Sequence, residues 1–133
     1  MTEKIEIEEL PVTREFRRQR RLIEERGELA LIEDGRSFRH LGYFSLLAGM
    51  SFYRGGHYHR RKVEHFYLIR GRITVRFVDL DTGARGTVEL REGERVTIHP
   101  GCAHRFEAKE DAHVIEYYDS LYDLEDDIPF TDF

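Results

Sequence analysis

Residues 53–71 read "YRGGHYHRRKVEHFYLIRG", and they hold three of the seven histidines in a chain of 133 residues. His57 and His59 are two positions apart, and Glu64 follows five residues after the second of them. Side chains at i and i+2 of a β-strand point to the same side. The stretch therefore predicts two imidazoles that converge on one face of a sheet.

Short apolar runs flank this stretch, and the turn sequences "DTG", "EGE" and "PG" separate several of them. Residues 72–80, "RITVRFVDL", alternate mostly with period two, as a half-buried strand does. Strands at short regular spacing without a convincing interior helix predict an all-β sandwich or barrel. The expected strands are 28–33, 42–48, 63–70, 72–80, 86–90, 95–99, 103–108 and 113–118.

The composition limits the class of protein. Apolar residues make up 40% of the chain and aromatic residues 12%, which favours a folded domain with a real core. The balance of 21 Lys and Arg against 26 Asp and Glu argues against a generic nucleic-acid binder, because phosphate contacts favour a basic surface. We therefore expect no nucleic-acid partner.

The sequence also indicates a compartment. No run of 18 apolar residues predicts a membrane span, and the N-terminus lacks the apolar stretch of a signal peptide. The single cysteine, Cys102, rules out an internal disulfide and fits a reducing compartment. We therefore expect a cytoplasmic protein without a membrane partner.

A carboxylate and a distant histidine extend the histidine pair. Glu64 shares one face of its strand with Phe66 and Leu68, and burial of a carboxylate is costly unless a cation or strong hydrogen bonds offset it. His104 opens another strand after a Pro-Gly turn. Three imidazoles and one carboxylate suit divalent Zn, Mn, Fe or Ni, and the ligand set alone does not choose among them.

These residues resemble the first motif of the cupin superfamily, whose fold is a double-stranded β-helix, or jelly-roll barrel. That motif is H-x-H, three or four residues, E, six residues, G, and it is matched by His57, His59, Glu64 and Gly71.

In the second cupin motif, Gly93, Gly101 and His104 match at the right spacing. Three positions depart from the two motifs, and none of them is a metal ligand in the family pattern: Ser51, His99 and Ala108. The resemblance covers roughly residues 40–118. It implies one divalent metal ion (Zn, Mn, Ni or Fe) inside the barrel, bound by His57, His59, Glu64 and His104.

Residues 42–77 also look like the cupins that act on nucleotide-linked keto-deoxysugars. That branch includes dTDP-4-dehydrorhamnose 3,5-epimerase, the dTDP-4-keto-sugar ketoisomerases and the C-terminal cupin of capsular-polysaccharide-assembling proteins. Its R-G-x-H element is matched by Arg54 to His57, and residues 23–33 resemble its opening segment. In the metal-free epimerases the second histidine position is typically glutamine and the first histidine is the base. His59 departs from that pattern and favours metal binding.

The resemblance implies an epimerase or isomerase that acts next to the ketone of a nucleotide-linked deoxysugar or related sugar. A metal-dependent dioxygenase and a non-catalytic cupin that binds a small molecule are the alternatives. Arg54 could pair with a substrate phosphate or be a strand-edge charge. His99 and Tyr117 are the other predicted catalytic residues, and His113 and Tyr118 are further acid–base candidates.

We expect one domain over residues 1–133, with an N-terminal arm at 1–27, a barrel at 28–118 and a tail at 119–133. The acidic tail could cover the barrel or be a loose end. The basic cluster at 14–26 could bind phosphate or be a solvated face. We expect a homodimer, because closed two-fold assemblies are the commonest.

Two residues near the predicted ligands have simpler interpretations. His65 should point away from the side that Glu64 faces, which predicts a surface or interface residue. Cys102 could support thiol chemistry two residues before His104, but a small loop residue is the simpler interpretation.

Overall fold

The computed structural model describes residues 1–15 and 20–133, so part of the basic cluster lies outside the described residues. In the described part the chain is nearly all β, as predicted, with one short 3-10 helix, η1 (Leu124–Asp126). The strands are β1 (Ile5–Glu9), β2 (Arg21–Glu24), β3 (Gly27–Ala30), β4 (His40–Leu46), β5 (Arg54–Tyr58), β6 (Glu64–Asp79), β7 (Arg85–Arg91), β8 (Glu94–Ile98), β9 (Cys102–Tyr118) and β10 (Ile128–Pro129).

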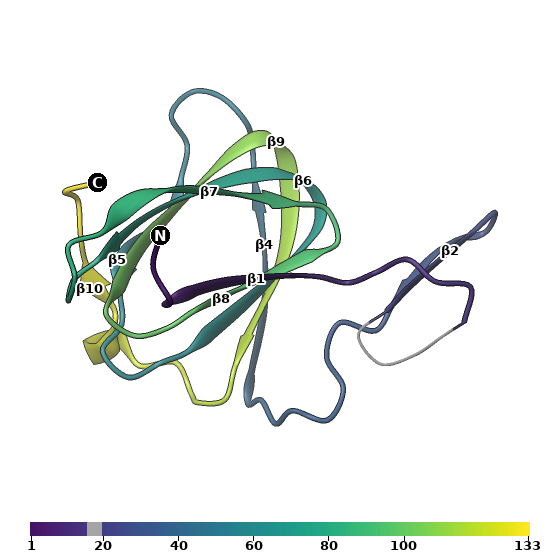
Figure 1. Cartoon of the computed structure of the whole chain (residues 1–133), viewed down its shortest axis with the longest axis horizontal. Coiled ribbons are helices and arrows are strands. Elements are labelled where there is room, and N and C mark those ends of the chain that lie inside the picture. The colour runs from purple at the N-terminus through teal and green to yellow at the C-terminus, as the bar shows by residue number, and fades with distance from the viewer. Residues whose placement is uncertain (16–19) are drawn as a thin grey trace.

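The two longest strands, β6 and β9, lie in the wall of the barrel and pair antiparallel along most of their length. The strands β8 and β7 pair with β6, and β4 and β5 pair with β9. The sheet ends with β1 beyond β8 and with β10 beyond β5. Figure 1 shows how these strands curve around one interior. The four predicted strands at 63–80 and 103–118 are thus two continuous strands.

Gly71 allows β6 to bend past β9. Its φ is +103°, and a Cβ atom at this position would lie 2.4 Å from the main-chain oxygen of Asp111. The register between the two strands shifts between Leu68 and Ile73, on either side of this glycine. A residue with a side chain therefore meets both backbone strain and a steric clash here.

The interior is filled by alternate side chains of the long strands and their neighbours. The central buried apolar residues are Phe66, Leu68, Ile73, Val75, Phe77, Val96, Ile98, Phe106 and Val114. Their period of two is the pattern read from residues 72–80. Two of these side chains, Phe66 and Phe106, contact the ring of His104.

The outer face of β6 is also covered, and the prediction that His65 is a surface residue is wrong. His65 points away from the interior as expected, but it is only 5% exposed. Its ring lies against Tyr117 and contacts the guanidinium of Arg36, which comes from the segment before β4. Arg95 donates a hydrogen bond to the Ile32 carbonyl of the same segment. The sequence pattern of one strand gave no indication of this covering segment.

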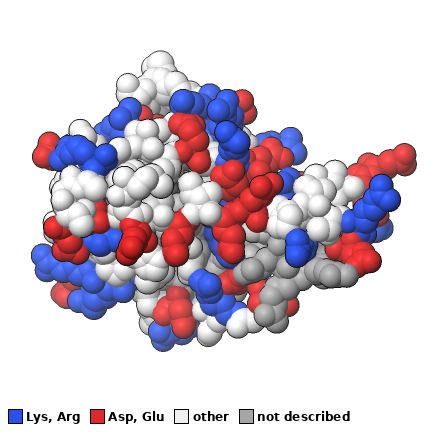
Figure 2. Space-filling model, viewed as in Figure 1, with Lys and Arg blue, Asp and Glu red and all other residues white. Residues whose placement is uncertain are grey.

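The N-terminal residues divide between the barrel and a projecting hairpin. β1 pairs with β8 from Ile5 opposite Ile98, so the structure places the first part of the expected arm in the barrel. β2 and β3 pair only with each other, and Figure 1 shows this hairpin reaching away from the barrel. Figure 2 shows acidic and basic side chains side by side over the visible face.

A buried ion pair fastens the N-terminus and predicts acid sensitivity. The Lys4 ammonium lies 2.7 Å from Asp79 Oδ1, and this contact, with the Thr2 hydroxyl, holds the pKa of Asp79 well below its ordinary value of 3.8. Stability from a lowered carboxyl pKa is fully present above the unfolded value and disappears as the pH falls toward the folded value. Asp79→Asn should therefore cost roughly 2 kcal/mol at pH 7 and progressively less below pH 4.

Thermal unfolding of wild type and Asp79→Asn between pH 7 and pH 2 measures this gap in stability between the two proteins. Asp81→Asn is the matched control, since the Asp81 side chain is 81% exposed and also contacts Lys4. A gap between wild type and Asp79→Asn that stays constant across the pH range would contradict the ion-pair account.

Candidate metal centre

The structure brings the four predicted ligands together. His57, His59, Glu64 and His104 each offer one ligand atom, and these four atoms lie within 4.8 Å of one another. Glu64 begins β6, His104 lies near the start of β9, His57 lies on β5, and His59 follows directly after β5. The side chains of His59, Glu64 and His104 are 0–5% exposed, whereas His57 is 24% exposed. Solvent therefore reaches the cluster at His57.

A bulge in β5 aims His57 at the cluster. The register between β5 and β9 shifts between Gly55 and His57, which places His57 opposite His104. Gly55 has φ +85°, and a Cβ atom there would lie 2.8 Å from the main-chain oxygen of His104. The Gly-Gly sequence before the first histidine thus permits a close approach of backbones that re-aims the next side chain.

Each imidazole is oriented through its Nδ1 atom. The partners are the Asp127 carboxylate for His57 (2.7 Å), the Asp126 carbonyl for His59 (2.5 Å) and the Cys102 carbonyl for His104 (3.0 Å). A carbonyl can only accept, so Nδ1 of His59 and of His104 carries the proton. The Nε2 lone pairs are then free to bind a metal ion, and such orienting partners are typical of metal-bound histidines.

The buried atoms at the centre fit a divalent cation. Glu64 Oε1 lies 2.9 Å from His59 Nε2 and 3.3 Å from His104 Nε2. All three atoms are buried, and none of them has a hydrogen-bond partner. Two ligands about 2.1 Å from one ion lie about 3.0–3.4 Å apart at octahedral or tetrahedral angles. The spacing of these three atoms is therefore compatible with ligands of one divalent ion.

Electrostatics in the cluster follow from burial and from Glu64. Burial, with the neighbouring imidazoles, lowers the pKa of His57 to about 4. Burial also acts to lower the pKa of His59, but the Glu64 carboxylate outweighs it and raises that pKa. Burial acts to raise the pKa of Glu64, while His104 and His59 hold it well below its ordinary value. Glu64 is thus an anion at neutral pH, as a metal ligand must be.

Lys62 contacts the other oxygen of Glu64, and the sequence-based prediction of the site did not include it. Its ammonium lies 3.7 Å from Glu64 Oε2 and 4.1 Å from the centre of the Tyr118 ring. The Lys62 side chain is only 8% exposed. The available signal in the sequence was Glu64, two residues after Lys62, because a buried carboxylate needs a second partner. The contact leaves Oε1 as the oxygen that faces the histidines.

Three more titratable groups face the interior on the side of β4. Tyr118 ends β9, directly after the Tyr117 that pairs with His65 of β6, and His40 stacks on the Tyr118 ring with 4.0 Å between centroids. His40 Nε2 lies 3.5 Å from Glu116 Oε1. Burial, together with the charges of Glu116 and Glu64, raises the pKa of Tyr118 to about 12. Its hydroxyl therefore stays protonated at neutral pH.

Two predicted catalytic residues do not reach the cluster. Tyr117 lies on the outer face of β9, opposite to its neighbour Tyr118, and its buried hydroxyl accepts a hydrogen bond from Arg95 at 2.9 Å. His99 follows β8 on the outside and lies 2.8 Å from the Glu6 carboxylate. Both residues point away from the interior because strand side chains alternate between the two faces.

Arg54 lies at the rim of the interior. Its Cα is in register with Phe106, and its guanidinium lies 5.8 Å from the centre of the Phe44 ring. Phe44 stacks on Phe106, which in turn contacts His104, so two phenyl rings connect Arg54 to the cluster. Within residues 1–15 and 20–133 the guanidinium forms no ion pair and donates only to the Ser45 carbonyl.

Cys102 is a packing residue rather than a reactive thiol. It is 1% exposed and belongs to the apolar core. Burial raises its pKa to about 12, which keeps the thiol protonated. The thiolate is the reactive form, so the structure gives no support to thiol chemistry here.

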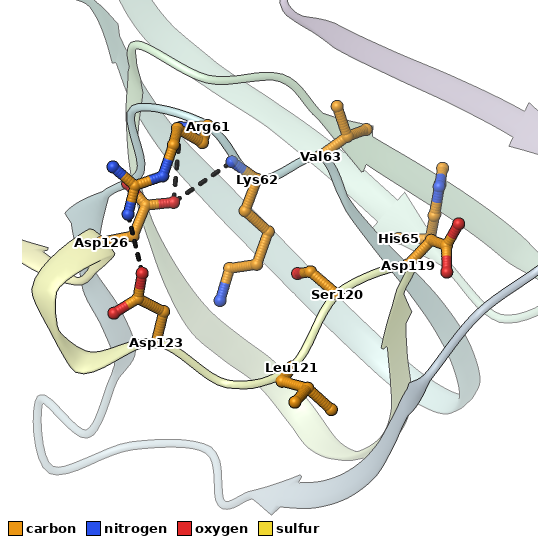
Figure 3. A pocket seen from close by; sticks show the side chains of 9 residues that line it. All are labelled: Arg61, Lys62, Val63, His65, Asp119, Ser120, Leu121, Asp123 and Asp126. Carbon is orange, nitrogen blue, oxygen red and sulfur yellow. Dashed lines mark hydrogen bonds and ion pairs between the residues drawn. The ribbon is translucent and has the colours of Figure 1, made fainter.

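A cavity of about 360 Å³ lies beside the cluster, between the loop after β5 and the tail. Figure 3 shows the Lys62 side chain crossing it and the Asp126 carboxylate at one wall. The residues that line the cavity include Lys62 but none of the four predicted ligands. The described residues contain no helix with the length and apolar character that a membrane crossing requires.

Solved structures share this architecture and define the class of fold. The sugar 3,4-ketoisomerase of Thermoanaerobacterium thermosaccharolyticum, in complex with TDP, has a TM-score of 0.77 at 16% identity, with 100% of this chain and 93% of that chain covered. A TDP-quinovose 3,4-ketoisomerase of Campylobacter jejuni has 0.75 at 16%, covering 96% and 93%. The dTDP-4-dehydrorhamnose 3,5-epimerase of Sulfolobus tokodaii has 0.75 at 20%, covering 96% and 77%. The fold is the cupin jelly roll.

The sequence itself places the chain in a family. Residues 23–127 match the family described as "Polysaccharide biosynthesis C-terminal domain", and the chain belongs to this family. A search among curated protein sequences finds no match. The matched residues include all four predicted ligands and Asp126, so the family match covers the whole candidate site.

Proposed function

We propose that the chain binds one divalent metal ion and catalyses an epimerisation or isomerisation next to the ketone of a nucleotide-linked deoxysugar. The metal site is supported by the approach of Glu64 Oε1 to two imidazole Nε2 atoms. All three atoms are buried, and none of them has a hydrogen-bond partner. The sugar chemistry is supported by the fold, which is shared with proteins described as TDP-sugar ketoisomerases and 3,5-epimerases.

The residues around the site divide into ligands and proton carriers. A bound divalent ion would polarise the ketone oxygen of the substrate. Because His57 is a ligand in this proposal, another interior group must carry the proton of the adjacent carbon. Tyr118 is protonated and suits the proton donor, while His40, stacked on its ring and next to Glu116, suits the acceptor.

Two adjacent tyrosines give a direct test of this assignment. Tyr118→Phe should slow proton exchange next to the ketone by about 100-fold or more, since general acid–base groups contribute about 10²–10⁴ in rate. Tyr117→Phe is the matched control and should stay within a few-fold of wild type. Deuterium incorporation into TDP-4-keto-6-deoxyglucose, followed by NMR, measures both. Full exchange in Tyr118→Phe would remove it from the mechanism, and no exchange by wild type would contradict the proposed substrate.

Arg54 is proposed to bind the diphosphate of the nucleotide. It is exposed at the rim and free of carboxylate partners in the described part of the chain. Arg54→Ala should weaken TDP binding by about 10- to 100-fold, the contribution of charge-assisted hydrogen bonds to an anion. Calorimetry with TDP measures this, with Arg91→Ala on β7 as an exposed-arginine control. Equal affinity in the two variants would return Arg54 to the role of a strand-edge charge.

The remaining sequence predictions stay predictions. The structure holds no observation that favours a dioxygenase or a non-catalytic binding cupin over the isomerase. Both use the same four ligands, and they are distinguished by oxygen consumption and by ligand binding without turnover. The homodimer and the cytoplasmic location also stay predictions.

A further inference from the structure

The acidic tail is docked against the site rather than loose. β10 pairs with β5 and lies opposite His57 and Tyr58. Just before it, η1 ends at Asp126, which is 4% exposed although it carries a carboxylate. Burial of an ionised carboxylate needs strong compensation by hydrogen bonds.

The compensation comes from three consecutive main-chain N–H groups in the loop after His59. They belong to Arg60, Arg61 and Lys62, and they donate to the Asp126 carboxylate at 2.7, 3.3 and 3.2 Å. Figure 3 shows two of these contacts at the wall of the cavity. The carboxylate thus fixes the loop that connects His59 to Glu64.

The same residue orients His59 with its main chain. The Asp126 carbonyl accepts the hydrogen bond from His59 Nδ1. One residue of the tail therefore holds the loop through its side chain and the imidazole through its backbone. The two contacts support each other, since the carboxylate bonds keep the carbonyl at the place where the imidazole meets it.

We propose that Asp126 is a positioning residue for the site: it fixes His59 in the Nδ1–H form and aims Nε2 at Glu64. The consequence for metal affinity rests on the proposed function, but the effect on the imidazole does not. Loss of an orienting partner typically weakens metal binding about 10- to 100-fold. Asp126→Ala removes all three loop contacts, and Asp126→Asn keeps one acceptor oxygen.

Nitrogen NMR of the histidine rings in the metal-free protein, recorded above the raised pKa of His59 so that the ring is neutral, tests the proposal, because the two neutral forms of imidazole differ in their ¹⁵N shifts. We expect a single Nδ1–H form for His59 in wild type and a mixture of forms in Asp126→Ala. Zn²⁺ affinity should fall about 10- to 100-fold in the alanine variant and by less in Asp126→Asn. Asp123→Ala is the matched control, since Asp123 caps η1 and pairs with Arg61 but contacts no histidine.

The outcomes separate this inference from the proposed function. Unchanged His59 shifts in a folded Asp126→Ala protein would overturn the positioning role. If Asp126→Ala does not fold, the same measurements on Asp126→Asn test the proposal. Wild-type His59 shifts and wild-type Zn²⁺ affinity in Asp126→Asn would then overturn the positioning role. A change in Asp123→Ala as large as in Asp126→Ala would show general loosening of the tail, and would also overturn it. Absence of Zn²⁺ binding in wild type would contradict the metal site while the ring measurement still stands.

Discussion

Alanine at His59 or at Glu64 is expected to abolish stoichiometric binding of a divalent metal. Each replacement removes one of four ligands, and even loss of an orienting partner costs about 10- to 100-fold in affinity, so loss of a ligand should cost at least about 100-fold. Glu64→Ala should be the more severe, because it removes the only anion among the four and leaves Lys62 without its buried partner. Titration of metal-free protein with Zn²⁺ and with Mn²⁺ measures both affinities.

An exposed histidine provides the control for these variants. His99→Ala removes an imidazole on the outer face that pairs with Glu6, and this variant should bind metal as wild type does. Circular dichroism must show that each variant is folded. Wild-type affinity in folded His59→Ala and Glu64→Ala proteins would mean that the cluster is not the binding site.

The largest expected loss of stability is at the bend of β6. Gly71→Val should lower the free energy of unfolding by about 3 kcal/mol or more, since strain at positive φ adds to overpacking against a neighbouring strand. Gly83→Ala is the matched comparison: its φ is +76°, but a Cβ atom there meets nothing within 4 Å. Only the backbone strain of about 1 kcal/mol should then appear.

Urea unfolding of the two glycine variants measures the difference. A Gly71 variant no less stable than the Gly83 variant would show that β6 and β9 can separate at the bend without cost. The motif glycine would then have a role other than close packing of the two strands.

The fold and the convergence of His57 with His59 were predictable because their signals are local. Alternation in residues 72–80 and the spacing of His57 and His59 depend only on the period of a strand. His104 could be joined to them through the motif resemblance, and the structure brings all four together. Continuous strands across Gly71 were not predictable, since a glycine between two strand patterns is also typical of a turn.

Residues that orient the ligands could not be predicted, because their contacts are long-range. Asp126 and Asp127 lie more than 60 positions after the histidines they touch, in a tail whose composition gave no register. The preference for Tyr117 over Tyr118 failed for a related reason: alternation separates the two faces, but only the pairing with β6 shows which face is interior.

His65 illustrates the remaining limit of a strand pattern. Alternation correctly placed His65 on the other face of the strand from Glu64. The segment that contains Arg36 covers that outer face and buries His65. A side chain on the outer face of a sheet is exposed only when no other segment packs there, and the period of one strand carries no information about such a cover.

Metal content of the wild-type protein tests the central claim most directly. The protein is purified without added metal or chelator, and the metal per chain is measured by elemental analysis before and after reconstitution with Zn, Mn, Ni and Fe. We predict close to one equivalent per chain. Iron as the retained metal would favour the dioxygenase alternative, whereas Zn, Mn or Ni would leave sugar isomerisation ahead. No metal after reconstitution would contradict the ligand assignment and return His57, with its Asp127 partner, to the role of candidate base in a metal-free epimerase.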